Sequence, residues 1–204
     1  SSDLETVKMP GRRLSRRTLR VGTSSVAVAA TTSYIVLGSG ISASPPVRKF
    51  RAKLPIPPVL SPVRSDAVAD YYDIEQRVGE GHILPSLKTT LWGYNGVFPG
   101  PTIRARAGRT IIVRQTNRLA VPTATHLHGG ITPSDSDGFP TDLSVPDGFP
   151  VDVPICGSLP SIGDLIRSGQ TPPGNVKLHT YPNQQRAAPL WYHDHAMDFT
   201  GRNV

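Results

Sequence analysis

The chain has 204 residues, which allow one domain, or one domain with a tail. Its formal net charge is +7, but residues 1–43 hold six basic and two acidic residues, so the remainder has a net charge of +3. A nucleic-acid-binding protein should present a clustered basic face with aromatic side chains for stacking. The basic residues of the remainder are scattered singly, as at Arg104, Arg106 and Arg114. Nucleic-acid binding is therefore not expected.

Residues 1–43 have the pattern of an export signal. Positions 15–20 are SRRTLR, a twin-arginine pattern, and positions 21–43 carry no charged side chain. Small residues at 41–43 offer a cleavage site. The uncharged run is long enough to cross a bilayer, but its Ser, Thr and Gly content argues against a stable membrane anchor. We therefore expect a twin-arginine signal peptide and export to the extracellular space or the cell envelope.

Proline dominates the next stretch, residues 44–66, with six prolines between Pro45 and Pro62. Proline has no amide hydrogen to donate and its φ is fixed, so such a run does not enter the interior of a sheet. The stretch is expected to lie extended across a surface, in the simplest case as a linker.

Residues 67–204 predict short strands separated by turns that contain glycine and proline. Residues 102–107 place Ile103, Ala105 and Ala107 on one side, which predicts a half-buried strand. Many short strands of this kind predict an all-β sandwich or barrel. Further strands are expected at 70–78, at 110–116 with both faces buried, at 176–180, and at 190–195, where the apolar run Leu190, Trp191 and Tyr192 is expected to be buried.

Residues 141–174 are rich in proline and contain no motif that we can assign. Ile162, Leu165 and Ile166 have helical spacing, so two helical turns are expected between Ser161 and Ser168.

Two His-x-His pairs are the candidate metal ligands: His126 and His128 in THLHGG, and His193 and His195 in LWYHDHAM. Successive side chains of a strand point to opposite faces, so the two histidines of each pair share a face. Imidazole is a ligand for copper, zinc, iron and nickel, and two pairs on neighbouring strands can bracket a metal ion or a small cluster. One such pair is as often an ordinary surface or core pattern as a metal site, but two pairs favour a metal site.

The residues that follow His128 separate three families of metalloprotein. A metallo-β-lactamase-like hydrolase requires His-x-His-x-Asp-His, whereas Gly129, Gly130 and Ile131 follow here. A cupin requires a glutamate shortly after the pair, and none is near. The third family is the multicopper oxidases.

Six motifs occur along the chain: LPIPPVL (54–60), LWGYNGVFPGPTI (91–103), THLHGG (125–130), SDSDGFP (134–140), YPNQQR (181–186) and LWYHDHAM (190–197). With these motifs the chain resembles the N-terminal domain of the multicopper oxidases, in the branch of bacterial spore-coat laccases and bilirubin oxidases. The resemblance covers residues 49–204 except for 141–174, where the sequence departs from the family pattern.

The resemblance implies a cupredoxin-like (plastocyanin-like) Greek-key β-sandwich over residues 67–204, incomplete before its last strand, with residues 44–66 as a strap. It also implies that the domain supplies half of the ligands of a trinuclear copper cluster. By position, His126 would bind the type 2 copper, and His128, His193 and His195 would bind the type 3 pair.

The remaining copper ligands are expected in C-terminal cupredoxin domains that this chain lacks. A type 1 (blue) copper requires a cysteine flanked by histidines, and Cys156 has no neighbouring histidine. Cys156 is therefore expected to be a free buried thiol or half of a disulfide to another part of the protein. The resemblance implies a small phenolic or similar reducing substrate, and dioxygen as the electron acceptor.

Other polar residues near the pairs have competing interpretations. Asp137 is either a proton relay, because the family keeps an acidic residue beside the type 2 copper channel, or an ordinary turn residue. Asp194 faces away from the ligands, so an orienting or structural role is expected. His82 and His179 are isolated in the sequence and are not expected in the site.

Two hypotheses for the function remain open. The chain is either the N-terminal domain of a copper oxidase, inert alone, or a stand-alone copper- or zinc-binding β-module without redox turnover. Ser1 is not an initiator methionine and Val204 directly follows a motif, so a fragment is expected.

Overall fold

A computed structural model describes residues 49–84, 87–155 and 157–200. The predicted signal at 1–43 and Cys156 lie outside the described residues. The fold described below is that of the unit Val47–Val204. Within the described ranges, no helix is long and apolar enough to cross a membrane.

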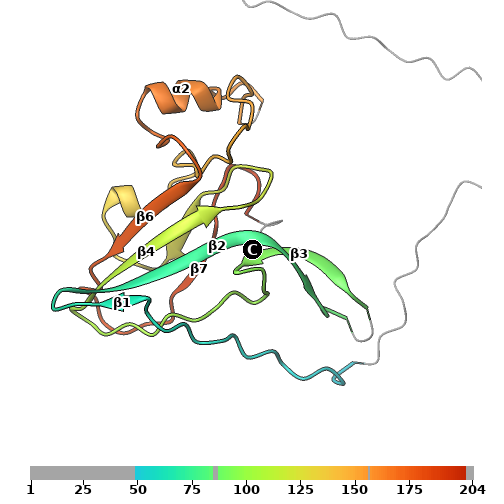
Figure 1. The fold of residues 1–204 in the computed structure, drawn as a ribbon, viewed down its shortest axis with the longest axis vertical. Helices are drawn as coiled ribbons and strands as arrows, with labels where there is room; N and C mark the ends of the chain where they lie inside the picture. The colour runs from blue at the N-terminus through green and yellow to red at the C-terminus, as the bar shows by residue number, and fades with distance from the viewer. Residues whose placement is uncertain (1–48, 85–86, 156, 201–204) are drawn as a thin grey trace, which may run out of the picture. The chain divides into compact units, whose positions relative to one another are not determined.

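The larger sheet is built around the long strand β2. Its members in the described part of the chain are β1 (Arg64–Ser65), β2 (Ala69–Gly81), β3 (Thr89–Tyr94), β4 (Thr110–Asn117) and β6 (Val176–Tyr181). The order is β1-β2-β4-β6, and β3 also pairs with β2 (Figure 1). The β2–β4 pairing is parallel and the other pairings are antiparallel.

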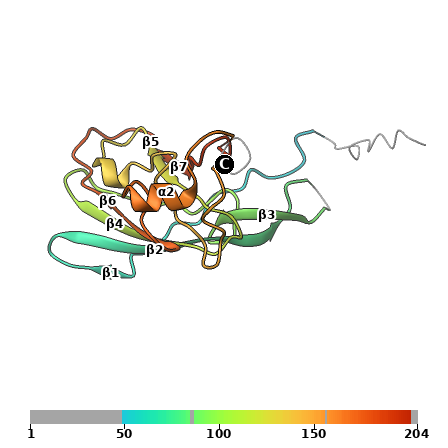
Figure 2. The same ribbon diagram turned by 90° about the horizontal axis from the view of Figure 1, so that it is seen from above.

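A smaller sheet carries three of the four predicted ligands, His126, His128 and His193. It consists of β5 (Thr125–His128) and β7 (Trp191–Asp194), which pair antiparallel. Figure 2 shows this pair in a layer of its own over the larger sheet. The prediction of an all-β sandwich is confirmed.

Two clusters of buried side chains lie among the described residues. The first, here called the sheet cluster, packs Leu127 and Tyr192 of the smaller sheet against the larger sheet. The second, here called the loop cluster, includes Ala124 and Ala196, which flank β5 and β7. The buried members of the sheet cluster are Tyr72, Ile74, Ile111, Val113 and Tyr181, and those of the loop cluster are Ala124, Leu143, Val145, Ile162, Leu165 and Ala196.

The short helix α2 (Ile162–Arg167) confirms the helix predicted between Ser161 and Ser168. Ser161 is its N-cap, and the Ser161 and Asp164 side chains each bond the other's backbone N–H in a capping box. Ile162 and Leu165 are buried members of the loop cluster. The segment 141–174 therefore supplies most of the loop cluster, which it shares with Ala124 and Ala196.

The strand predicted at 102–107 is wrong. Only Thr102 forms a bridge, with Val59 of the proline-rich stretch, while Ala105 and Ala107 are exposed. The reason is the composition of the partner segment. Leu60 N–H donates to Thr102 O and Thr102 N–H donates to Pro58 O, but the prolines of this segment have no N–H with which to extend the ladder.

Two predictions of burial are also corrected. Ile111 and Val113 of β4 are buried, but Ile112 is only half-buried, because the outer face of β4 also carries the exposed Arg114. Leu190 and Trp191 are exposed, at 36% and 46%. Trp191 stands on the same open face as the histidines, which explains its exposure.

Candidate metal centre

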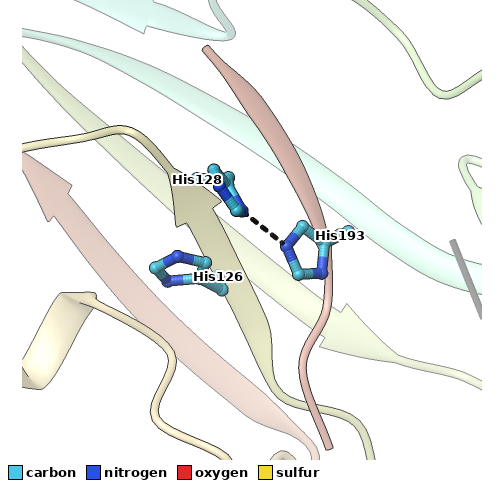
Figure 3. Close-up of side chains that lie close together, drawn as sticks. All are labelled: His126, His128 and His193. Carbon is cyan, nitrogen blue, oxygen red and sulfur yellow. Dashed lines mark hydrogen bonds between the residues drawn. The ribbon is translucent and has the colours of Figure 1, made fainter. Parts of the chain in front are cut away.

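The pairing of β5 with β7 brings the two His-x-His pairs together. His126 lies opposite His193 and His128 lies opposite Trp191, and residues directly opposite in an antiparallel pair project from the same face. Ligand atoms of His126, His128 and His193 all lie within 4.8 Å of one another. Figure 3 shows these three rings, two from β5 and one from β7.

His195 lies just beyond the end of β7 but stays in line with it. Its N–H donates to Ala124 O over 2.6 Å, which continues the ladder by one residue. Its ring centroid lies 5.0 Å from that of His126 and 5.7 Å from that of His193. The four predicted ligands are therefore neighbours on one face, with His195 outside the 4.8 Å group of three.

Main-chain carbonyls fix three of the rings. The Nδ1 atom lies 2.5 Å from Asp137 O in His126, 2.8 Å from Asp194 O in His193 and 3.1 Å from Gly138 O in His195. A carbonyl oxygen only accepts, so the neutral ring carries its hydrogen on Nδ1 and leaves the Nε2 lone pair free. Metal-binding histidines are held in this way.

His128 differs from the other three. Its Nδ1 lies within hydrogen-bonding distance of His193 Nε2, at 3.4 Å (Figure 3), so these two ring nitrogens face the same space. Burial, and then the neighbouring His126, His195 and His128, lower the pKa of His193. His193 is therefore neutral at pH 7, the form that binds a metal ion.

The turn that supplies two of these carbonyls packs closely on β5. It contains the 3-10 helix η1 (Ser134–Ser136), followed by Asp137 and Gly138. Gly138 has φ of +74°, and a Cβ there would lie 1.9 Å from Thr125 O. Only glycine fits this position.

His179 is buried, and the sequence did not show its role. It is 1% exposed, and its Nδ1 lies 3.3 Å from Ser136 O in η1. Burial lowers the pKa of His179 to about 4, so it is neutral at pH 7. As predicted, His179 is not one of the clustered rings, but it contacts the turn that supports them.

Gln185, in the YPNQQR motif, was not singled out from the sequence. Its Oε1 accepts from Ile131 N–H over 2.5 Å and its Nε2 donates to Gly129 O over 3.0 Å. Gln185 thus fixes the turn directly after His128. The YPNQQR motif supported the family resemblance, but it did not indicate that Gln185 contacts this turn.

The Asp194 side chain joins two segments of the backbone. Its Oδ1 accepts from Ala124 N–H over 2.8 Å and from Ala196 N–H over 3.0 Å. These bonds join the start of β5 to the chain after His195, so the carboxylate faces the backbone and not the ligand face.

Asp137 lies beside His126. Its Oδ1 is 3.6 Å from His126 Nδ1 and accepts from the Thr132 hydroxyl over 3.0 Å. Its side chain is 41% exposed, so it reaches both the ring and solvent.

A cavity of about 350 Å³ lies between the two sheets. Ile74 and Val113 line it from the larger sheet, and Leu127 and Tyr192 line it from the smaller sheet. None of the four predicted ligands is among its lining residues. The cavity therefore excludes the four histidines, although its lining includes Trp191, whose ring stacks on His128 and His193.

Four imidazoles, three of them held through Nδ1 by a main-chain carbonyl, form a donor set that suits copper, zinc, iron or nickel. The residues present therefore fit a copper site, although the donor set alone does not select copper. A β-sandwich with such a face is the kind of scaffold on which a metal site can be built, and the comparisons below give its class.

Comparison with known proteins narrows this class. A sequence model of the family described as multicopper oxidase matches residues 77–146. The chain is 35% identical over 181 residues to a laccase of Bacillus subtilis, covering 78% of this chain and 32% of that protein. It is 33% identical to a bilirubin oxidase of Albifimbria verrucaria, covering 79% of this chain and 25% of that protein.

Solved structures agree with this result. A laccase from Pediococcus acidilactici superposes with a TM-score of 0.58 at 28% identity, over 76% of this chain and 28% of that one. The chain belongs to the multicopper oxidase family, and its fold is cupredoxin-like, as predicted. It spans about a third of the length of the Bacillus relative and a quarter of that of the bilirubin oxidase.

Proposed function

We propose that this chain is the first cupredoxin domain of a copper-dependent oxidase and supplies half of the ligands of a trinuclear copper cluster. The observation that carries the proposal is the convergence of two His-x-His pairs on one face, with His128 and His193 in contact although they are 65 residues apart in the chain. By the resemblance, His126 would hold a type 2 copper, and His128, His193 and His195 a type 3 pair.

The rest of the site is proposed to come from further cupredoxin domains of the same protein. The relatives' greater length supports this, since this chain covers 32% of the Bacillus laccase. Those domains would supply the other half of the cluster ligands and the type 1 copper.

When bound, the copper ions would accept single electrons that originate from a phenolic or similar substrate and use four of them, with four protons, to reduce dioxygen to two water molecules. The chain's own residues would hold and orient the ligand rings, through the carbonyls of Asp137, Gly138 and Asp194. The Asp137 carboxylate, close to His126 and open to solvent, would pass protons to the site.

The twin-arginine pattern supports a proposal of export. Since that route carries folded proteins, it suits a protein that is loaded with metal before export. Replacing Arg16 and Arg17 by lysine should retain the protein in the cytoplasm, as measured by fractionating the producing cells. Export of the double variant at the normal level would contradict this.

The central test replaces one ligand from each strand in the full-length protein. His126→Ala and His193→Ala should each abolish dioxygen consumption while the blue absorption of the type 1 copper stays nearly intact, because that copper is bound elsewhere. His82→Ala is the matched control, since His82 is exposed and its Nδ1 lies 3.1 Å from the nearby Leu87 O, away from the four histidines in the sequence.

Retained turnover in either ligand variant would contradict the assignment. If the wild-type protein bound copper or zinc through these histidines but consumed no dioxygen, the stand-alone metal-binding module would be the better account.

A further inference from the structure

One short turn holds a ring from each His-x-His pair. Asp137 O is 2.5 Å from His126 Nδ1, and Gly138 O is 3.1 Å from His195 Nδ1. Both acceptors are main-chain atoms, so the position of the backbone sets the two rings.

A buried contact with β6 fixes that backbone. The His179 Nδ1–H donates to Ser136 O over 3.3 Å, and Thr180 N–H donates to Ser136 Oγ over 2.9 Å. His179 and Ser136 are 1% and 2% exposed. Hydrogen bonds shielded from water hold their geometry more firmly than exposed ones.

The opposite side of the turn is closed by β5. Gly138 packs so tightly on Thr125 O that no Cβ could be added. The turn is therefore clamped between β6 of the larger sheet and β5 of the smaller sheet. A shift at Ser136 would move the carbonyls of the next two residues, Asp137 and Gly138.

We propose that His179 and Ser136 are positioning residues of the metal site, which lock the turn 133–138 so that its carbonyls hold His126 and His195 with Nε2 free for a metal ion. The inference rests on the proposed function, because it takes these two histidines as metal ligands. His193 lies outside this mechanism, since its Nδ1 is held by the carbonyl of its own neighbour Asp194.

The test compares His179→Leu, which removes the donor, with His179→Asn, which keeps an N–H donor on the same side of the ring position. Two quantities are measured. The first is the nitrogen that carries the hydrogen on each ring of the metal-free protein, by ¹⁵N nuclear magnetic resonance. The second is the affinity for Cu(II) in a direct titration.

In His179→Leu, we expect His126 and His195 to become mixtures of the two tautomers while His193 keeps its hydrogen on Nδ1. The Cu(II) dissociation constant should rise about tenfold, the lower end of the effect seen when the partner of a ligand is lost. His179→Asn should restore both quantities. Ile74→Val, a mild loss of packing in the sheet cluster, is the control for general loosening and should change neither.

If His179→Leu leaves both quantities at wild-type values, if His179→Asn behaves like His179→Leu, or if Ile74→Val has the same effect, the proposal is wrong. Should His179→Leu not fold, Ser136→Ala removes the hydroxyl that accepts from Thr180 and should give the same two changes; wild-type values there would overturn the proposal. Failure of the wild-type protein to bind Cu(II) through these histidines would instead overturn the proposed function, because the tautomers are measured without metal.

Discussion

The sheet cluster and the loop cluster support the histidine strands from different sides. The sheet cluster lies under the β5–β7 pair and contacts it through Leu127 and Tyr192. The loop cluster lies at the end of the pair and includes Ala124, just before β5, and Ala196, just after His195.

The two clusters therefore support different parts of the site. Regular strand pairing sets the register that places His126 opposite His193. The loops set where the chain enters and leaves that pair, and hence the place of His195 beyond the end of β7. A variant in the sheet cluster should therefore act on the stability of the whole domain, and one in the loop cluster also on the metal site.

The largest effect on stability is expected from truncating one buried side chain in each cluster. Ile74→Ala and Leu165→Ala should each lower the free energy of unfolding by about 2–5 kcal/mol, because both side chains are almost fully buried. Only Leu165→Ala should also weaken Cu(II) binding by the folded protein, since its cluster includes the neighbour of His195. Denaturant unfolding and copper titration measure the two effects. Equal losses of copper affinity in the two variants would remove the distinction.

A smaller effect is expected at Asp194, where the ends of the two strands meet. Asp194→Ala would leave the N–H groups of Ala124 and Ala196 without this acceptor, which costs about 1–3 kcal/mol for a buried group. Amide hydrogen exchange at both positions should become faster. Asp194→Asn keeps an acceptor oxygen and is the control, with a smaller loss expected; equal exchange rates in all three proteins would contradict the role.

The smallest effect is the response to acid. In the larger sheet, hydrogen bonds to Asp70, chiefly from Arg109, lower the pKa of Asp70 to about 2. In the helix α2, hydrogen bonds from Ser161 and Arg167 lower the pKa of Asp164. A carboxylate with a folded-state pKa below its unfolded value stabilises the fold above about pH 4, and this contribution is lost as the pH falls through the folded value.

Stability should therefore decrease between about pH 4 and about pH 2. Asp70→Asn should flatten this dependence for the whole domain, because Arg109 links the start of β2 to the start of β4. Asp164→Asn should flatten the pH dependence only when unfolding is followed by a probe that reports on α2. Unfolding followed at several pH values by two probes measures both, and an unchanged slope in Asp70→Asn would contradict the assignment.

The sequence predicted the parts of the molecule that depend on local pattern. The alternation at His126 and His128 is enough to place both rings on one face, and the helical spacing of Ile162, Leu165 and Ile166 is enough to predict α2. The all-β class followed from the many short apolar runs.

The parts that depend on distant partners were missed. The alternating residues 102–107 resemble a strand, but their neighbour is rich in proline and gives them a single bridge. The polar side chain of His179 is buried because η1, more than forty residues earlier, covers it. Neither partner can be recognised from the segment itself.

The separation of the two ligand strands also bears on how the protein is made. His128 and His193 are 65 residues apart in the chain. The four histidines therefore come together only after the slow, long-range pairing of β5 with β7 has formed. A cupric ion present earlier would meet two separate bidentate pairs, each free to capture it alone or to cross-link two nascent chains. Under the proposed function, we therefore expect the polypeptide to fold before it binds copper.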